Sequence, residues 1–287
     1  MKSPNFVYLS TVVLFLFVTG TSCKKNSGNN TTTPQDKDPD GVVITGNSTF
    51  GNVITDNEGH TLYFFFNDAA AGSACTGDCL VAWPLFYEDN LTIGAGLNAS
   101  DFGTITRSDG KKQSTFKGWP LYYYQGDAKK GDVNGDKVGN LWAVAKPDYT
   151  VMIANAQLVG ADGANYNEQG TAATGSSQYL TDPVGRTLYT FIKDSANHNV
   201  FTKSDFSNDA VWPIFQVSTV GSIPSVLSKD QFSVINVFGK SQLVCKGRPL
   251  YYFGQDNSVK GSTKGVSFPT PGAAIWKIIN SNTTVLK

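Results

Sequence analysis

One ten-residue pattern occurs four times in this chain, and that recurrence restricts the possible folds more than any other feature of the sequence. Every copy follows the form G-x-[TP]-L-Y-x-[FY]-x-x-D, and the copies occupy residues 59–68, 118–127, 185–194 and 247–256. Chance does not produce such a pattern four times. A chain built from copies of one unit is expected to bury its hydrophobic faces by packing the copies against each other.

A tryptophan follows every motif tyrosine by 20 to 25 residues. In chain order, the tyrosine, aspartate and tryptophan of the four copies are Tyr63, Asp68 and Trp83; Tyr122, Asp127 and Trp142; Tyr189, Asp194 and Trp212; and Tyr251, Asp256 and Trp276. The segments around the first and third tryptophans are also alike, since they read A-W-P-L-F and V-W-P-I-F. The chain therefore divides into a first repeat, residues 42–147, and a second repeat, residues 150–287, each made of two related halves.

Each half is predicted to form four short β-strands. The 29 glycines, 12 prolines and 12% aromatic residues are typical of short strands joined by tight turns, and helical periodicity appears nowhere over a useful length. The predicted strands are, half by half, 42–45, 52–56, 61–66 and 83–87; 102–106, 113–116, 120–124 and 141–145; 150–154, 178–181, 187–192 and 211–216; and 232–237, 242–246, 249–253 and 275–279. An all-β fold follows, with a compact four-bladed propeller favoured and two β-sandwich or barrel-like domains as the alternative.

The N-terminal residues 1–22 are predicted to be a signal peptide. Lys2 provides a positive start, residues 7–18 form an apolar run too short to span a bilayer, and small residues precede Cys23. Cys23 is therefore the expected lipidation site, although a plain secretory peptide with an incidental cysteine is the alternative. The polar residues 23–41 are predicted to form a flexible tether. These features predict a lipid-anchored protein of the cell envelope, at the outer membrane, with the membrane face left open.

The motif tyrosines and aspartates allow two interpretations. They could form a surface where rings and carboxylates meet a ligand. Alternatively, each tyrosine packs between strands with its hydroxyl bonded, and each aspartate accepts hydrogen bonds from backbone N–H groups of the next turn. Recurrence in four places favours the structural interpretation, because a single active site needs no fourfold copying.

The cysteines after the tether are expected to be structural. Cys75 and Cys79 lie four residues apart in an exported chain, so a local disulfide is favoured over a redox-active pair or a metal site. The ring it closes is short, so its contribution to stability should be small. Cys245 takes the place of an aromatic strand residue and is expected to be a buried thiol.

One segment resembles the opening of a calcium-binding loop. Asp132, Asn134 and Asp136 alternate as oxygen ligands do in such a loop. Lys137 stands where the loop needs glycine, and Ala143 stands where it needs a closing carboxylate. A solvated turn is therefore favoured, and the three residues remain only a weak candidate for a metal site.

At these residues the chain resembles the bacterial secreted-repeat lipoproteins that carry a Y-x-[FWY]-x-x-D motif. The resemblance covers nearly the whole exported part and rests on the four motif copies, on C-T-G-D-C at 75–79 ahead of Trp83, and on the segment 110–123. The group has no established biochemical function, so the resemblance implies an address and a repeat unit without an activity. The second repeat departs from the pattern, because residues 201–206 contain no cysteine and Cys245 replaces Phe116.

Charge and motifs then limit the functional classes. Equal numbers of basic and acidic residues, 23 of each, leave no electrostatic footprint for nucleic acid. The chain holds no G-x-S-x-G element, and its two histidines, His60 and His198, fall in turns or polar loops where they are expected to be solvated. The leading hypothesis is a non-enzymatic binding or scaffolding module with no cofactor, whose aromatic surface contacts an envelope protein or glycan.

Two other hypotheses make different predictions. A carboxylate-based hydrolase predicts a deep pocket that gathers two or more carboxylates, or His60 beside a tyrosine and an aspartate. An accessory to envelope electron transfer predicts a bound cofactor or a reactive Cys75–Cys79 pair.

Overall fold

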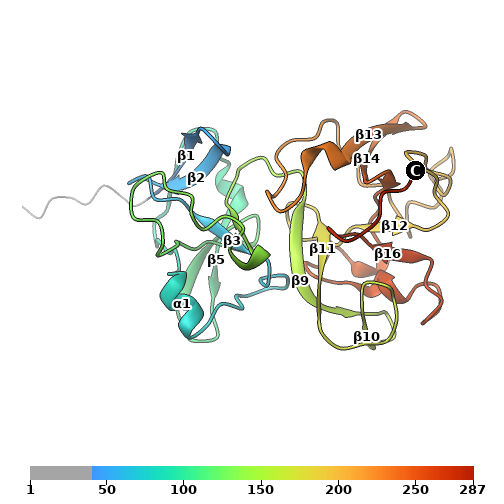
Figure 1. Ribbon diagram of the computed structural model, residues 1–287, viewed down its shortest axis with the longest axis horizontal. Coiled ribbons are helices and arrows are strands. Elements are labelled where there is room, and N and C mark those ends of the chain that lie inside the picture. Colours follow the sequence, from blue (N-terminus) through green and yellow to red (C-terminus); the bar gives the residue numbers. More distant parts are fainter. Residues whose placement is uncertain (1–40) are drawn as a thin grey trace, which may run out of the picture. The chain divides into compact units, whose positions relative to one another are not determined.

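The computed structural model describes residues 41–287, which belong to one folded unit (Figure 1). The predicted signal peptide, the lipidation site Cys23 and the tether up to residue 40 lie outside the described residues. Strand β1 begins at Gly41, where the tether was expected to end.

The described chain is mostly β, with very little helix, as the composition predicted. Its strands are β1 (Gly41–Asn47), β2 (Gly51–Asp56), β3 (Tyr63–Phe65), β4 (Thr92–Ile93), β5 (Phe102–Thr106), β6 (Lys112–Phe116), β7 (Trp119–Pro120), β8 (Trp142–Val144), β9 (Met152–Val159), β10 (Asn165–Tyr166), β11 (Ser176–Thr181), β12 (Tyr189–Phe191), β13 (Phe232–Val237), β14 (Lys240–Cys245), β15 (Arg248–Pro249) and β16 (Trp276–Ile278). The helices are α1 (Asp78–Ala82) and the 3₁₀ turns η1 (Ala99–Asp101), η2 (Val138–Asn140), η3 (Lys229–Gln231), η4 (Gly254–Asp256) and η5 (Lys264–Ser267). Within residues 41–287, no helix is both long and apolar enough to cross a membrane.

The two repeats build similar small sheets, although the third strand beside the first hairpin differs, since β4 pairs parallel to β1 and β10 pairs antiparallel to β9. The first repeat has β2-β1-β4, β3-β8 and β5-β6-β7, and the second has β10-β9-β11, β12-β16 and β13-β14-β15. The registers also correspond: β3 places Tyr63 opposite Val144, and β12 places Tyr189 opposite Ile278. In Figure 1 the first repeat runs from blue to green and the second from yellow-green to red. The prediction of two repeats with related organisation is therefore confirmed.

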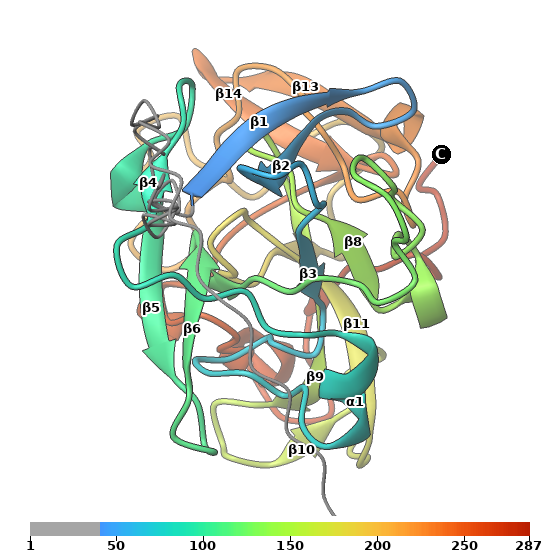
Figure 2. The same ribbon diagram turned by 90° about the vertical axis from the view of Figure 1, so that its left-hand side faces the viewer.

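Within each repeat, the two halves are joined through their motif tyrosines. The backbone N–H of Tyr63 donates to the carbonyl of Tyr122 over 2.9 Å, and the N–H of Tyr122 donates back over 3.1 Å. Tyr189 and Tyr251 exchange the same two bonds, at 2.9 Å each. Strand β3, at the centre of the first repeat in Figure 2, is thus shared between halves. The halves interlock instead of folding as separate blades.

The propeller is not confirmed. The sheets formed by residues 41–287 contain two or three strands, whereas a propeller blade contains four, and no sheet among them closes into a barrel. The strands expected at 83–87 and 211–216 are wrong, because these segments contribute only isolated bridges at Leu85 and Ile214. A proline follows the tryptophan in both segments, and proline cannot donate a ladder hydrogen bond.

The strands expected at 120–124 and 249–253 are also shorter than predicted. Only Trp119–Pro120 and Arg248–Pro249 pair with a neighbouring strand, and the chain then continues through a single bridge at Tyr122 or Tyr251. The tyrosine makes its backbone bonds to the sister half, and this interrupts the ladder within its own half.

Candidate functional site

A stack of four aromatic rings forms the centre of the first repeat. The indole rings of Trp83 and Trp142 lie 3.6 Å apart and within 3° of parallel. Tyr124 covers the outer face of Trp83 at 4.3 Å, and Phe65 covers the outer face of Trp142 at 4.2 Å. Tyr124 and Phe65 hold the same position in their motif copies, so the stack is symmetric about the tryptophan pair.

The second repeat contains the same stack. Trp212 and Trp276 lie 3.6 Å apart at 8°, with Phe253 at 4.3 Å on one side and Phe191 at 4.7 Å on the other. Stacked and edge-to-face aromatic pairs add stability beyond the area that they bury. The tryptophans that follow each motif copy therefore meet as pairs within a repeat, at a distance that the sequence does not reveal.

Each motif tyrosine donates its hydroxyl to the aspartate of the sister half. Tyr63 bonds Asp127 at 2.6 Å, and Tyr122 bonds Asp68 at 2.8 Å. In the second repeat, the tyrosine–aspartate bonds are Tyr189 to Asp256 at 2.7 Å and Tyr251 to Asp194 at 2.8 Å. Bonded tyrosine hydroxyls were expected from the sequence, but the motif pattern gave no sign that these bonds would cross between halves.

The other carboxylate oxygen of each aspartate accepts a backbone N–H from the following loop. Asp68 accepts from Ala74 at 2.6 Å, and Asp194 accepts from Val200 at 2.9 Å. Burial raises the pKa of both carboxyl groups to about 6, and it raises the pKa of all four motif tyrosines well above their ordinary value. The hydroxyl and carboxylate groups are thus hydrogen-bonded within the protein, an arrangement that agrees with a structural role, and of the four aspartates only Asp127 is half-buried.

A small pocket opens beside the aromatic stack of the first repeat. Its volume is about 290 Å³, and we call it the motif pocket. The residues that line it are His60, Thr61, Pro84, Tyr123, Tyr124 and Asp127. Pocket linings of this kind, mostly apolar with a few placed polar groups, are typical of ligand sites.

The second repeat forms the same pocket at the same six positions. The counterparts are, in the same order, Arg186, Thr187, Pro213, Tyr252, Phe253 and Asp256, and together with Gly254 and Ser258 they line a smaller cavity of about 100 Å³. Local chain geometry explains the recurrence. The turns that follow β2 and β11 present His60 and Arg186, and the motif of the sister half supplies both aromatic rings and the aspartate.

A buried aspartate holds one wall of each motif pocket in place. In the first repeat, Asp56 accepts hydrogen bonds from the His60 ring at 3.1 Å and from the Tyr123 hydroxyl at 3.0 Å. In the second, Asp182 accepts from Arg186 at 2.6 Å and from Tyr252 at 3.0 Å. His60 therefore lies beside a tyrosine and an aspartate, which is the arrangement that the hydrolase hypothesis predicted.

The counterpart in the second repeat indicates what this arrangement does. Arg186 makes the same contact as His60, yet a guanidinium group has no acceptor and does not give up its proton in proteins. A contact that also forms with arginine does not require a proton acceptor. The contact of the aspartate with His60 or Arg186 and with the tyrosine therefore serves as a brace for the pocket wall.

The structure joins Cys75 and Cys79 in a disulfide, with their Cα atoms 5.3 Å apart. The bond lies in the loop after the first motif, and Cys75 is fully buried among the aromatic rings of the first repeat. Cys245 is a buried free thiol, as expected, and burial raises its pKa to about 12. His198 lies in an exposed turn where its N–H bonds Ser195.

The three residues of the weak calcium candidate have separate roles. Asp132 accepts the N–H of Lys129 at 3.0 Å, and Asn134 donates to the carbonyl of Gly126 at 3.2 Å. Asp136 accepts the N–H of Val144 and the hydroxyl of Ser225 from the second repeat. Among residues 41–287 there is no group of three or more His, Cys, Asp or Glu side chains placed to hold a metal ion.

Sequence reasoning missed the two brace aspartates and treated His60 as solvated. A signal was present, because Asp56 and Asp182 each stand seven residues before a motif tyrosine. Both lie at the end of a strand and begin the turn that leads to the motif. Extending the repeat comparison backwards by three residues would have found them.

The comparisons with known proteins agree with the repeat organisation. No curated protein and no solved structure matches the chain. One family model matches it twice, at residues 44–86 and 103–146, and thus once in each half of the first repeat. By that match, the first repeat is similar to a family described as a secreted repeat of unknown function.

Proposed function

We propose that this chain is an exported, lipid-anchored module of the cell envelope that binds a glycan through its motif pockets and carries out no catalysis. The observation that supports the proposal is the recurrence of one pocket, with the same six positions, in both repeats. Packing alone requires the buried tyrosines and tryptophans, but it does not require an open cavity beside them. The secreted character of the matched family agrees with export.

The lining of the motif pocket suits a sugar. Tyr123, Tyr124 and Pro84 provide apolar surfaces on which the C–H face of a pyranose ring can pack. Asp127 and His60 provide polar atoms that can bond sugar hydroxyls. Two copies of one site also suit a ligand that repeats along its length, because linked weak sites gain affinity through effective concentration.

Binding to a panel of immobilised oligosaccharides tests the proposal. We expect the full-length protein to be retained on a subset of glycans. Tyr123→Ala and Tyr252→Ala should each weaken retention, and the double variant should abolish it. Tyr87→Ala, which removes a half-buried tyrosine outside the pockets, is the matched control. Retention of the double variant at the level of the parent protein would contradict the proposal.

The lipid anchor is tested separately. Cys23→Ser should eliminate incorporation of labelled fatty acid and release the protein from the membrane fraction. Fatty-acid incorporation that persists in the Cys23→Ser variant would exclude this residue as the anchor. Fractionation of the envelope would then assign the protein to the outer or the inner membrane.

An accessory role in envelope electron transfer is the second candidate. The tryptophan pairs at 3.6 Å, each flanked by two tyrosine–aspartate hydrogen bonds, are the specific observation in its favour. This role requires a bound chromophore or a reactive Cys75–Cys79 pair. An absorption spectrum of the purified protein, combined with titration of its thiols before and after mild reduction, distinguishes it from glycan binding.

A further inference from the structure

Part of the contact between the two repeats is made by one aromatic face of the first repeat. Phe64, Phe66 and Trp119 form this face, which we call the junction face. The indole N–H of Trp119 donates to the carbonyl of Pro183 at 3.0 Å, and the carbonyl of Phe66 accepts the N–H of Asn155 at 2.8 Å. All three side chains of the junction face are buried.

The second repeat has a counterpart of every residue on the junction face. Strand registers make Thr190 the counterpart of Phe64 and Arg248 the counterpart of Trp119. Ile192 is the counterpart of Phe66, and its exposed fraction is 48% where that of Phe66 is 0%. The face that docks in the first repeat is therefore more polar in the second, where Thr190 stays buried but Ile192 and Arg248 are accessible.

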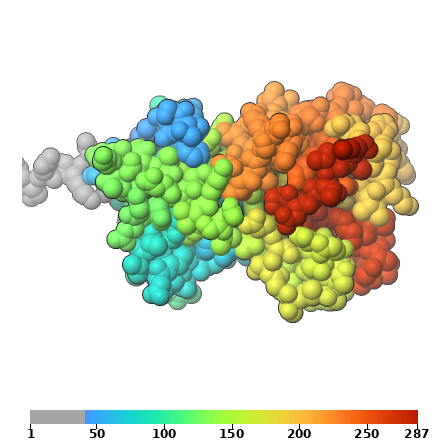
Figure 3. All heavy atoms as spheres, in the orientation of Figure 1, coloured from blue at the N-terminus to red at the C-terminus, as the bar shows by residue number. Residues whose placement is uncertain are grey.

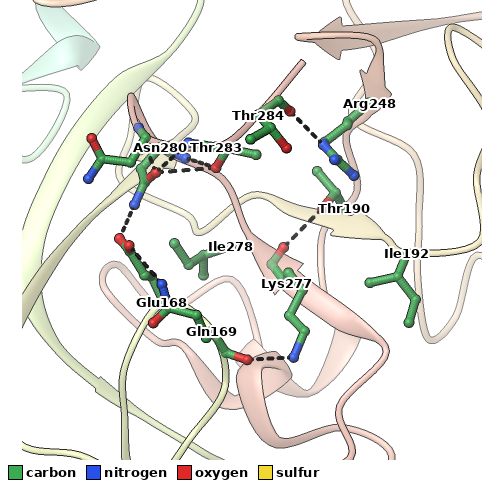
Figure 4. A pocket seen from close by; sticks show the side chains of 11 residues that line it. Glu168, Gln169, Thr190, Ile192, Arg248, Lys277, Ile278, Asn280, Thr283 and Thr284 are labelled. Atoms are coloured by element: carbon green, nitrogen blue, oxygen red, sulfur yellow. Dashed lines mark hydrogen bonds between the residues drawn. The ribbon is translucent and has the colours of Figure 1, made fainter. Parts of the chain in front are cut away.

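A pocket of about 370 Å³ occupies this open face. Figure 4 shows Glu168 and Gln169 on one side of the pocket and Arg248 on the other, with Thr190, Lys277 and Ile278 between them. The loop after β10 supplies the first wall, and the C-terminal segment supplies another. In Figure 3 that segment, dark red, lies at the surface against the orange and yellow parts of the second repeat.

The two cations of this pocket, Arg248 and Lys277, bond backbone carbonyls instead of carboxylates. The Lys277 ammonium donates to the carbonyl of Gln169 at 2.7 Å, and Arg248 donates to the carbonyl of Thr284 at 3.3 Å. Among residues 41–287, no carboxylate forms a salt bridge with either cation. Glu168, the acidic residue in the lining, instead accepts the side-chain amides of Asn280 and Gln169. Partial burial lowers the pKa of Lys277, which a bound anion would reverse.

We propose that the pocket of Arg248 and Lys277 binds a small carboxylate ligand the size of one sugar ring. Arg248 and Lys277 bond neutral backbone carbonyls of the lining, so a carboxylate at either cation would form a charge-assisted hydrogen bond. Threonine hydroxyls and asparagine amides of the lining would bond the rest of a polar ligand, and Ile192 and Ile278 would contact its apolar atoms. The site lies apart from the motif pockets, so its ligand does not depend on the function proposed above.

Chemical-shift titration of the full-length protein tests this site with three probes. Galacturonate and galactose differ at one carbon, which carries a carboxylate in the first and a hydroxymethyl group in the second. Succinate provides a carboxylate without a sugar ring. We expect galacturonate to shift resonances of Thr190 and Thr283, and galactose to cause no such shifts at the same concentrations. Equal binding of galactose would refute the assignment to a carboxylate, as would failure of both acids to bind.

Two kinds of variant place the ligand. Arg248→Gln and Lys277→Gln should each weaken binding by about tenfold or more, since each removes a hydrogen bond to a charged group. Ile192→Trp fills the open pocket without altering charge, and its exposed position makes it safe for the fold; it should abolish binding. Lys111→Gln, an exposed lysine in the first repeat, is the charge control. Binding of the acids that Ile192→Trp leaves unchanged would show that the site lies elsewhere.

Discussion

The loop that follows the first motif is stabilised by different interactions in the two repeats. In both repeats the motif aspartate accepts a backbone N–H from this loop. The first repeat then closes the loop with the Cys75–Cys79 disulfide. The second repeat has Phe201 at the position of Cys75, and its ring packs edge-on against Trp276 at 4.8 Å. An aromatic ring and a disulfide thus cover the same aromatic stack.

The polar contacts beneath the loop differ in the same manner. Gln113 and its counterpart Gln242 both donate to a backbone carbonyl of the neighbouring motif. Arg107 links Gln113 to the loop in the first repeat, and Asn199 links Gln242 to the loop in the second. The glutamine that bonds a backbone carbonyl is thus the same residue type in both repeats. The side chain that links this glutamine to the loop differs between them. Backbone polar groups must be satisfied when buried, but many side chains can fill a given space.

The largest expected effect tests whether the two aromatic stacks are equivalent. Trp142→Ala and Trp276→Ala should each lower the free energy of unfolding by about 3–5 kcal/mol, because each leaves a cavity against its partner ring. Urea denaturation measures both. Phe238→Ala, at a ring with an exposed fraction of 57%, should change the free energy by less than about 0.5 kcal/mol. A difference of more than a factor of two between the tryptophan variants would break the comparison.

Arg107 should reveal a dependence that exists only in the first repeat. Its side chain is buried and bonds Ser73, Gln113 and the carbonyl of Cys75. Arg107→Met should lower the free energy of unfolding by about 3 kcal/mol, because it leaves buried hydrogen-bond acceptors without a donor. The counterpart substitution Val237→Met, at an apolar position, should cost under about 1.5 kcal/mol. Urea denaturation measures both variants. Equal decreases in the free energy of unfolding would show that the Arg107 network does not stabilise the loop.

The disulfide allows the interchange itself to be tested. Replacing Cys75 and Cys79 by serine should cost about 2 kcal/mol, because the closed ring is short. The variant Cys75→Phe/Cys79→Ala introduces the phenylalanine that the second repeat has at this position. It should recover part of the lost free energy of unfolding. Thermal melts with and without reductant measure the effect, and reductant should leave the second variant unaffected. A graft less stable than the serine variant would show that the two loops are not equivalent.

The sequence was informative wherever a contact is local. Turn residues placed the β5–β6 and β13–β14 strands nearly at their observed bounds, because glycine supplies the positive φ that such turns require at Gly110 and Gly239. The motif spacing also indicated that each aspartate would bond the next loop.

Contacts between halves could not be read in this way. Tyr63 and Asp127 lie 64 residues apart, and nothing in either motif copy says that its tyrosine will meet the other copy's aspartate. The prediction of separate blades is not confirmed for that reason. The pocket lined by Arg248 and Lys277 could not be predicted from the sequence either. Its residues come from distant parts of the chain, and they are recognised as a site only when the second repeat is compared with the junction face of the first.

The smallest expected effect is the pH dependence contributed by each buried motif aspartate. The pKa of Asp68 is about 6 in the folded chain and ordinarily 3.8, so the folded chain holds this proton more tightly than the unfolded chain. The stability from this group is fully present below pH 3.8 and is lost as the pH rises through 6. Lowering the pH from 7 to 5 should therefore add about 1 kcal/mol to the free energy of unfolding through Asp68. Asp194, with the same pKa, should add a similar amount in the second repeat. Urea denaturation at both pH values measures this increase in the free energy of unfolding. Asp68→Asn and Asp194→Asn should each remove the contribution of one aspartate, and the double variant should remove both. An increase that persists in the double variant would show that other groups cause it.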